Sequence, residues 1–242
     1  MKTNHSYLVT GGTSGIGKFV AQHLYERGHR VWITGTREET LRSALREGVA
    51  TGGSVCDISS TEQVRQAFAD ATAEGNLLDG VFANAGIDGE GVDAREVSPD
   101  NFLKVLDVNV VGTFRVAQAA FHYLNRPGAI VINSSVNSIR PEMHFVDYNT
   151  SKAGALAVAR SLALDWANTG ITVTSISPGY FRTNMTSAWI DDPESRQKLL
   201  ERIPMQRFGE PLEIASLVEF LLQNNVPFLN GADIPIAGTA NI

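Results

Sequence analysis

The chain has 242 residues, a net charge of −6, 43% hydrophobic residues and 19% charged residues. This length suits one α/β domain with a full core, and because no long basic run is present we expect no nucleic-acid partner. Residues 1–6 are polar and no apolar run is long enough to cross a bilayer, so we expect neither a secretory signal nor a membrane partner. The only cysteine, Cys56, excludes an intrachain disulfide and a cysteine zinc cluster, so we expect no metal site and a cytoplasmic location.

Short apolar runs rich in β-branched residues alternate with longer segments of helical periodicity. Repeated strand–helix units of this length predict a single α/β domain over residues 1–242, with a parallel sheet covered by helices on both faces. The third strand is short, and we expect Cys56 to lie buried in it. The predicted strands are 7–10, 30–34, 55–56, 80–83, 129–133, 171–177 and 232–236, and the predicted helices are 15–27, 38–46, 61–73, 99–124, 148–168 and 210–222.

A glycine-rich turn, T-G-G-T-S-G-I-G at Thr10–Gly17, joins the first strand to the first helix. Glycine lets the backbone turn tightly and approach a pyrophosphate, and the free N–H groups of a helix N-terminus attract that anion. The spacing G-x-x-x-G-x-G differs from the usual G-x-G-x-x-G, and a plain glycine turn is the alternative. We expect a bound dinucleotide to contact Gly11, Thr13, Ser14, Gly15, Ile16 and Gly17.

Two further strand ends carry residues suited to the adenosine half of such a cofactor. Asp57 follows the third strand, where its carboxylate could accept a hydrogen bond from an adenine amino group; capping the next helix is an equally good alternative. The small residues of A-N-A-G at 83–86 would let a ribose lie against the backbone, with Asn84 fixing the turn. The expected contacts here are Cys56, Asp57, Ile58, Asn84, Ala85 and Gly86.

The end of the second strand favours NADP(H) over NAD(H). An acid at that point would bind the adenosine ribose hydroxyls and select NAD. Gly35 stands there instead, and no acid appears until Glu38. Thr36 and Arg37 could hold a 2′-phosphate by charge-assisted hydrogen bonds. The alternative is that Arg37 simply points into solvent at the start of a helix, in which case NAD(H) remains possible.

The segment Y-N-T-S-K places Lys152 four residues after Tyr148, on one face of a predicted helix. A free tyrosine has a pKa of about 10, too high for efficient proton transfer at neutral pH. A nearby ammonium would favour the phenolate, and Lys152 could also reach the nicotinamide ribose. Ser135, at a strand end, could hold the substrate oxygen next to Tyr148. A surface pair on a helix is the alternative for Tyr148 and Lys152.

A polar residue, Asn109, falls inside the long apolar helix predicted at 99–124. Buried polar groups need partners, so Asn109 could hold a water chain, bend the helix or relay protons to Lys152. A purely structural role is almost as well supported by the sequence.

The turn P-G-Y-F-R-T after the sixth strand could present backbone groups and the Thr183 hydroxyl to a nicotinamide carboxamide. Residues 183–209 would then follow the carboxyl end of a strand, where ligands bind in this architecture, so they are the candidate substrate lid. An ordinary pair of surface helices is the alternative. The expected cofactor contacts in the turn are Pro178, Gly179, Phe181 and Thr183.

With these motifs in this order, the chain resembles the short-chain dehydrogenases/reductases over essentially its full length. The resemblance implies a Rossmann-type, doubly wound sheet of seven parallel strands and a homo-oligomer, usually a tetramer, with a dimer as the alternative. Residues 183–209 look like the 3-oxoacyl-carrier-protein reductase and sugar-alcohol dehydrogenase branches. Carrier-protein reductases usually have a basic residue where this chain has Thr169, so we expect a small substrate rather than an acyl carrier. The implied catalytic residues are Asn109, Ser135, Tyr148 and Lys152.

Together these features predict an oxidoreductase that transfers hydride between a nicotinamide cofactor and a ketone or secondary alcohol, with Tyr148 as general acid and base. A non-catalytic dinucleotide sensor is one alternative, but no catalytic residue is missing. An epimerase or dehydratase that oxidises its substrate transiently is another. Such relatives usually carry a longer substrate domain, whereas only about ninety residues follow Lys152 here.

Overall fold

The sheet at the centre of the molecule has seven strands, all parallel, in the order β3-β2-β1-β4-β5-β6-β7. A computed structural model describes residues 4–183, 186–223 and 226–241. The reversal of strand order between β1 and β4 is the signature of a doubly wound fold, so the predicted fold class is confirmed. The strands are β1 (Ser6–Val9), β2 (Arg30–Gly35), β3 (Gly52–Val55), β4 (Leu78–Ala83), β5 (Leu124–Asn133), β6 (Ile171–Pro178) and β7 (Asp233–Ile236).

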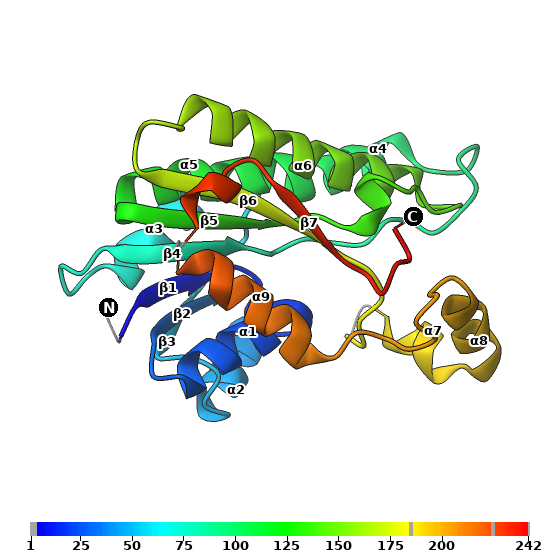
Figure 1. Cartoon of the computed structure of the whole chain (residues 1–242), viewed down its shortest axis with the longest axis horizontal. Helices are drawn as coiled ribbons and strands as arrows, with labels where there is room; N and C mark the ends of the chain where they lie inside the picture. Colours follow the sequence, from blue (N-terminus) through cyan, green and yellow to red (C-terminus); the bar gives the residue numbers. More distant parts are fainter. Residues whose placement is uncertain (1–3, 184–185, 224–225, 242) are drawn as a thin grey trace.

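Helices cover both faces of the sheet (Figure 1). Successive side chains of a strand point to opposite faces, so Leu8 packs with α3, α5 and α6 while Tyr7 and Val9 pack with α1, α2 and α9. Both faces are therefore apolar, as expected for a fully covered parallel sheet. The helices are α1 (Gly15–Glu26), α2 (Glu38–Arg46), α3 (Thr61–Ala71), α4 (Pro99–Leu106), α5 (Thr113–Tyr123), α6 (Val146–Asp165), α7 (Ser187–Asp191), α8 (Pro193–Glu201) and α9 (Pro211–Leu222).

The third strand lies earlier than predicted, at Gly52–Val55, and Cys56 follows it rather than lying within it. Two glycines hid this strand, because glycine has a low strand propensity. The packing explains them: a Cβ on Gly52 would lie 2.4 Å from the Trp32 ring, and one on Gly53 would lie 2.7 Å from the Ile33 carbonyl oxygen. Cys56 is nevertheless buried, as expected.

The long helix predicted at 99–124 is in fact two α-helices joined by a π-helical turn at Asp107–Gly112. Asn109 lies in that turn, where its main-chain oxygen accepts a hydrogen bond from Thr113 Oγ1 at 2.8 Å. The helix then ends at Tyr123, and β5 begins with Leu124, five residues before the predicted strand start. A register irregularity between β4 and β5 accompanies this early start.

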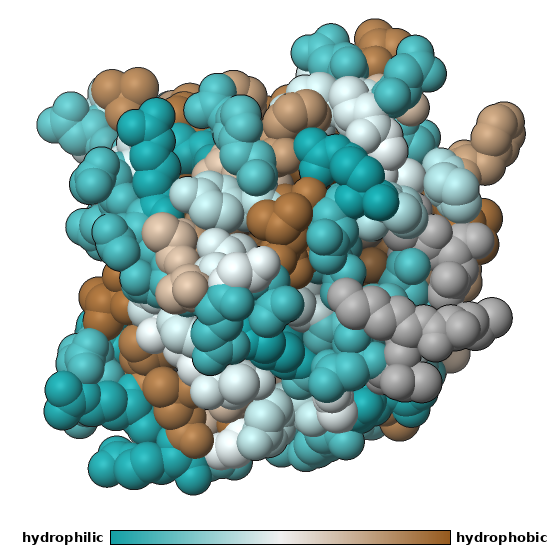
Figure 2. Space-filling view, turned by 90° about the vertical axis from the view of Figure 1, so that its left-hand side faces the viewer, coloured by the Kyte–Doolittle hydropathy of each residue, from teal (hydrophilic) through white to brown (hydrophobic). Residues whose placement is uncertain are grey.

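The two ends of the sheet differ. Where the strands begin, the surface is mainly hydrophilic with scattered apolar side chains (Figure 2). Where they finish, α7 and α8 project beside the sheet (Figure 1). No helix among the described residues is long and apolar enough to cross a membrane.

Candidate functional site

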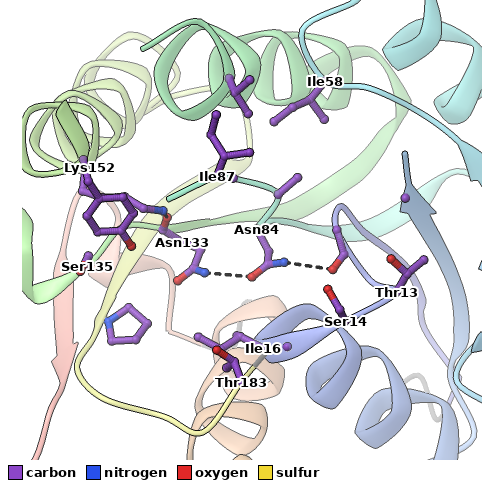
Figure 3. Close-up of a pocket in the computed structure, with 18 of the residues that line it drawn as sticks. Thr13, Ser14, Ile16, Ile58, Asn84, Ile87, Asn133, Ser135, Lys152 and Thr183 are labelled. Carbon is purple, nitrogen blue, oxygen red and sulfur yellow. Dashed lines mark hydrogen bonds between the residues drawn. The ribbon is translucent and has the colours of Figure 1, made fainter. Parts of the chain in front are cut away.

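A cavity of about 440 Å³ opens at the carboxyl ends of the strands, where the order of the sheet reverses between β1 and β4. This is the position at which open parallel sheets bind ligands. Ser135 and Lys152 lie toward one end of it and Thr13 and Ser14 toward the other (Figure 3). The expected site residues that line it are Gly11, Thr13, Ser14, Gly15, Ile16, Thr36, Cys56, Asp57, Ile58, Asn84, Ala85, Gly86, Ser135, Tyr148, Lys152, Pro178, Gly179, Phe181 and Thr183.

The glycine turn is built around close contacts that exclude side chains. Gly11 and Gly15 have φ values of +65° and +54°, which favour glycine, and a Cβ on Gly17 would lie 2.3 Å from the Gly11 carbonyl oxygen. Gly17 therefore shapes the turn from beneath without lining the cavity. Ser14 is the N-cap residue of α1 but makes no side-chain cap, so the first N–H groups of the helix remain available to an anion.

A chain of amide side chains supports the cavity floor. Asn84 Nδ2 donates to the Thr10 carbonyl oxygen at 2.9 Å. Asn133 Nδ2 donates to Asn84 Oδ1 at 2.9 Å (Figure 3). Asn133 Oδ1 is buried and has no hydrogen-bond partner among the described residues. A buried polar atom without a partner is costly, so this oxygen suits a ligand donor. The sequence signal for Asn133 was its place at the strand end directly before Ser134 and Ser135.

Asp57 lines the cavity and does not cap the following helix. Ser60 is the N-cap residue of α3, accepting from the Gln63 N–H. Asp57 Oδ1 instead accepts from the main-chain N–H and the hydroxyl of Ser59, at 2.9 and 2.8 Å. Next to it, burial and the Asp57 charge raise the pKa of the Cys56 thiol to about 11, so this cysteine is a neutral packing group at physiological pH.

At the end of β2, the position expected to hold an acid in NAD-selecting proteins is closed to any side chain. A Cβ on Gly35 would lie 2.5 Å from Thr13 Cγ2. Thr36 lines the cavity, whereas Arg37 does not. Arg37 is exposed beside it, and no ion pair between described residues includes it.

Three side chains meet at the other end of the cavity: Tyr148 and Lys152 from α6, and Ser135 from the end of β5. Lys152 Nζ donates to the Asn133 carbonyl oxygen at 2.9 Å and lies 5.6 Å from the centroid of the Tyr148 ring. Burial lowers the pKa of Lys152 to about 8, although the Asp88 carboxylate opposes this shift. A lysine that titrates near neutral pH in a cavity is typical of functional sites.

The expected lowering of the Tyr148 pKa is not seen among these residues. Burial raises the pKa of Tyr148 above its usual value, the Asp88 charge raises it further, and a hydrogen bond with Ser135 opposes both. Desolvation of the phenolate is the largest of these effects. The Lys152 ammonium is instead held by the main chain of Asn133.

Asn109 does not line the cavity, and its amide is occupied by neighbouring groups. Its Oδ1 accepts from the Ile87 N–H at 2.8 Å, and its Nδ2 donates to the Ile87 carbonyl oxygen and to Ser151 Oγ, each at 2.9 Å. It stands behind Gly86, where a Cβ would lie 3.0 Å from Asn109 Oδ1 and 3.7 Å from Lys152 Nζ. Asn109 thus fixes the chain segment at Ile87, which passes close to Lys152.

The segment 183–209 contains α7 and α8; residues 184–185 within it lie outside the described part of the chain. Arg202, after α8, pairs with Glu142, whose Oε1 also accepts from the Tyr180 hydroxyl at 3.3 Å. Phe145 lies between Tyr148 and Trp189, with ring centroids 6.5 and 6.0 Å away. Thr186, in the predicted lid segment, also lines the cavity, and the cavity residues that sequence reasoning did not assign to the site are Gly35, Lys104, Val108, Asn133 and Ser134.

Comparisons with known proteins agree on the class of protein. The family model described as enoyl-(acyl carrier protein) reductase matches residues 11–239. The 3-oxoacyl-[acyl-carrier-protein] reductase of Mycobacterium tuberculosis is 33% identical over 97% of this chain and 92% of its own. Glucose 1-dehydrogenase of Gluconobacter oxydans is 32% identical over 96% of this chain and 90% of its own.

Solved structures are similarly close. An actinorhodin polyketide ketoreductase with NADPH superimposes with a TM-score of 0.90 at 29% identity, covering 100% of this chain and 98% of that one. An NAD⁺-bound xylitol dehydrogenase also gives 0.90, at 30% identity, covering 98% of this chain and 100% of that one. Relatives of this kind are thus reductases and dehydrogenases, with either nicotinamide cofactor.

Proposed function

The chain belongs to the short-chain dehydrogenase/reductase family and is a nicotinamide-dependent oxidoreductase of ketones and alcohols, and from that premise we propose an NADP(H)-dependent reductase of neutral ketones that acts through Tyr148. The observation that carries this proposal is the shared cavity. The glycine turn at one end and Tyr148, Lys152 and Ser135 at the other open onto the same space.

The residues present fit a dinucleotide. The uncapped N-terminus of α1 suits the pyrophosphate, and the turn beneath it has no room for side chains. The orphaned Asn133 Oδ1 offers an acceptor to the cofactor inside the cavity. NADP(H) is favoured because Thr13 leaves little room for an acid at position 35, while Thr36 lines the cavity and the exposed Arg37, which has no ion pair among the described residues, could contact a 2′-phosphate.

The catalytic residues have separate tasks in this proposal. A bound nicotinamide supplies hydride to the substrate carbon in reduction and accepts it in oxidation. Tyr148 donates its phenolic proton to the carbonyl oxygen and takes it back in the reverse direction. Ser135 hydrogen bonds to the same oxygen and holds it beside Tyr148. Lys152, which the Asn133 carbonyl oxygen holds in place, favours the phenolate of Tyr148. Asn109 holds the main chain at Ile87, which lines the cavity.

A neutral substrate is favoured because the arginines in the segments next to the cavity already have partners. Arg202 pairs with Glu142, Arg182 pairs with Asp191, and Arg140 donates to the Ala240 carbonyl oxygen. An acyl carrier would need a basic docking surface near Thr169. The nearby Arg126, at the start of β5, turns back toward the end of α5 and donates to the carbonyl oxygens of Leu124 and Phe121.

Residues 183–209 act as the substrate lid of this single domain in our proposal. Their support is the contact of Trp189 with Phe145 and the pairing of Arg202 with Glu142, which join the lid helices to the chain leading into α6. These contacts support a lid over an ordinary surface helix pair.

We further propose that the protein is a homotetramer. Large apolar side chains are exposed on the helices that cover one face of the sheet. They include Leu103 and Phe114 on either side of the π turn, and Leu164 on α6, a residue that is 79% exposed. Exposed apolar side chains gathered on one face are typical of protein–protein contacts. Light scattering after size exclusion measures the mass of the assembly; a monomer would contradict this proposal.

The proposed function is tested by following reduced-nicotinamide absorbance with NADPH and NADH in parallel. The substrates are simple ketones, diketones, keto-sugars and acyl thioesters. We expect turnover of uncharged ketones with NADPH. Turnover of acyl-carrier thioesters alone would overturn the substrate assignment, and equal rates with NADH would overturn the cofactor assignment.

A further inference from the structure

A fully buried carboxylate stands immediately before the catalytic tyrosine. Asp147, in the first turn of α6, has 0% of its surface exposed. Its Oδ1 accepts from the Tyr148 N–H at 2.8 Å, and its Oδ2 accepts from the Glu90 N–H at 2.9 Å and from Asn101 Nδ2 at 3.1 Å. Burying a carboxylate is costly unless its oxygens are satisfied, so these three contacts belong to a specific arrangement.

The three donors come from three separate parts of the chain. Glu90 lies in the loop that follows β4, Asn101 lies in the first turn of α4, and Tyr148 lies in α6. The loop approaches so closely that a Cβ on Gly89 would lie 2.4 Å from Asp147 Oδ1 and 3.0 Å from Tyr148 Cβ. Asp147 therefore joins the loop after β4 and the start of α4 to the helix turn that carries Tyr148.

No cation neutralises Asp147: no ion pair between described residues includes it. All three contacts are N–H donors, which an ionised carboxylate accepts with both oxygens. An asparagine at this position would turn an N–H₂ group against at least one of these donors. The three donors therefore require a carboxylate on a side chain as short as that of aspartate. Close packing alone would not require an acid here.

We propose that Asp147 is a positioning residue for the reduction: its carboxylate locks the loop at 89–90 and α4 onto the first turn of α6 and so fixes Tyr148 relative to the substrate oxygen. The inference rests on the proposed role of Tyr148 as proton donor. A proton donor must lie within hydrogen-bond reach of its acceptor, and small displacements of reacting groups have large effects on rate.

The test compares Asp147→Asn with Gly89→Ala, which keeps the charge but pushes the same carboxylate away. Asp165→Asn is the matched control, because it makes the same chemical change at the exposed far end of the same helix. We measure kcat and KM for an accepted ketone, the pH profile of kcat, the Kd for NADPH by fluorescence, and thermal stability. Both test variants should lose about 10- to 100-fold in kcat and shift the pH profile, while the Kd for NADPH stays unchanged.

The outcomes separate positioning from stability. Wild-type kcat and pH profile in Asp147→Asn would overturn the proposal, as would a loss of activity that only follows the loss of folded protein and of NADPH binding. If Asp147→Asn does not fold, Asn101→Ala removes one donor and should lower kcat less but in the same direction; unchanged kcat there overturns the proposal. Tyr148→Phe in the same assay must be inactive; if it is active, the proposed role of Tyr148 fails instead.

Discussion

The ammonium nitrogen of Lys152 lies over the Tyr148 ring, 5.6 Å from its centroid. The two residues are four positions apart on α6, so helix geometry brings them together. Helix geometry does not fix the direction of the Lys152 ammonium. A hydrogen bond of 2.9 Å to the Asn133 carbonyl oxygen fixes it. The catalytic end of the cavity is therefore assembled from α6 and the end of β5 together.

Tyr148→Phe should lower kcat severely, because it removes the proton that the substrate oxygen must receive. General acid catalysis contributes about 10²- to 10⁴-fold, so the loss of kcat should fall in that range. NADPH binding, measured by fluorescence, should be almost unchanged since the glycine turn is untouched. Retained turnover would show that another group donates the proton.

The rate of carbonyl reduction should fall as the pH rises through about 8, where Lys152 loses its proton. The loss of the positive charge beside Tyr148 disfavours the phenolate that forms as the proton leaves. The Asp88 carboxylate raises the pKa of both residues, so Asp88→Asn should move this fall to lower pH. The measurement is the pH profile of kcat.

Asp100→Asn is the control for this shift, because Asp100 is exposed in the first turn of α4. It should leave the pH profile in place. A profile that moves equally in both variants would mean that net charge, not the Asp88 carboxylate, sets the pH dependence.

Arg37→Ala should weaken NADPH binding by about tenfold and leave NADH binding nearly unchanged, because only NADPH carries the 2′-phosphate that the guanidinium would contact. Arg42→Ala removes another exposed arginine, on α2, which pairs with Glu38. This control should affect neither cofactor. Equal effects of Arg37→Ala on the two cofactors would leave Thr36 and the glycine turn as the only phosphate contacts.

Short-range patterns predicted the parts of the site that lie within one turn or one helix. The glycine turn could be located because a strand ends before Gly11 and a helix begins at Gly15, and Tyr148 and Lys152 because their spacing matches a helix. The same reasoning failed for β3, because its glycines are required by close contacts with the Trp32 ring and the Ile33 carbonyl oxygen, which strand propensity does not indicate.

Contacts between distant segments could not be predicted in this way. Asp147 and Asn101 are 46 positions apart, and nothing in the spacing of either segment indicates that they meet. The π turn could not be predicted for the same reason, because the periodicity of residues 99–124 fits one continuous helix. The turn lies where Asn109 contacts Ile87 and Gly112 packs against Ile58, two residues far away in the sequence. Asn133 was missed as well, although its place at a strand end directly before Ser134 and Ser135 was a signal that could have found it.

Arg202→Ala should raise KM for the substrate by about two- to fivefold without changing the Kd for NADPH. The Arg202–Glu142 pair is partly exposed, and such pairs contribute little energy, so only the position of the lid should respond. Arg196→Ala, on the exposed face of α8, is the matched control and should not change KM. If both variants behave as wild type, the Arg202–Glu142 pair does not set the position of the proposed lid.

The polar cluster around Glu219 on α9 should make the protein less stable in acid. His23 Nε2 lies 2.8 Å from Glu219 Oε2, and Arg27 and His29 contact Oε1 at 2.8 and 3.4 Å. Burial lowers the pKa of His29 below its usual 6.5, so the unfolded chain takes up this proton first. The contribution of His29 to stability is therefore present above pH 6.5 and is lost as the pH falls below it.

Glu219 acts in the same direction at lower pH. Burial alone would raise its pKa, but hydrogen bonds from His23 and His29 and the charge of Arg27 leave it below the usual 4.5. Its contribution is therefore present above pH 4.5 and is lost as the pH falls through the lowered value. Melting temperatures measured from pH 7 downward should fall first through the titration of His29 and then through that of Glu219.

His29→Gln tests the first of these steps because glutamine does not titrate. It should lower the melting temperature at pH 7 by about 2 °C or more, and it should flatten the fall between neutral pH and pH 5. His122→Gln is the control, since His122 is exposed at the end of α5 and should leave both unchanged. An unaltered fall in His29→Gln would show that His29 does not cause the loss of stability between neutral pH and pH 5.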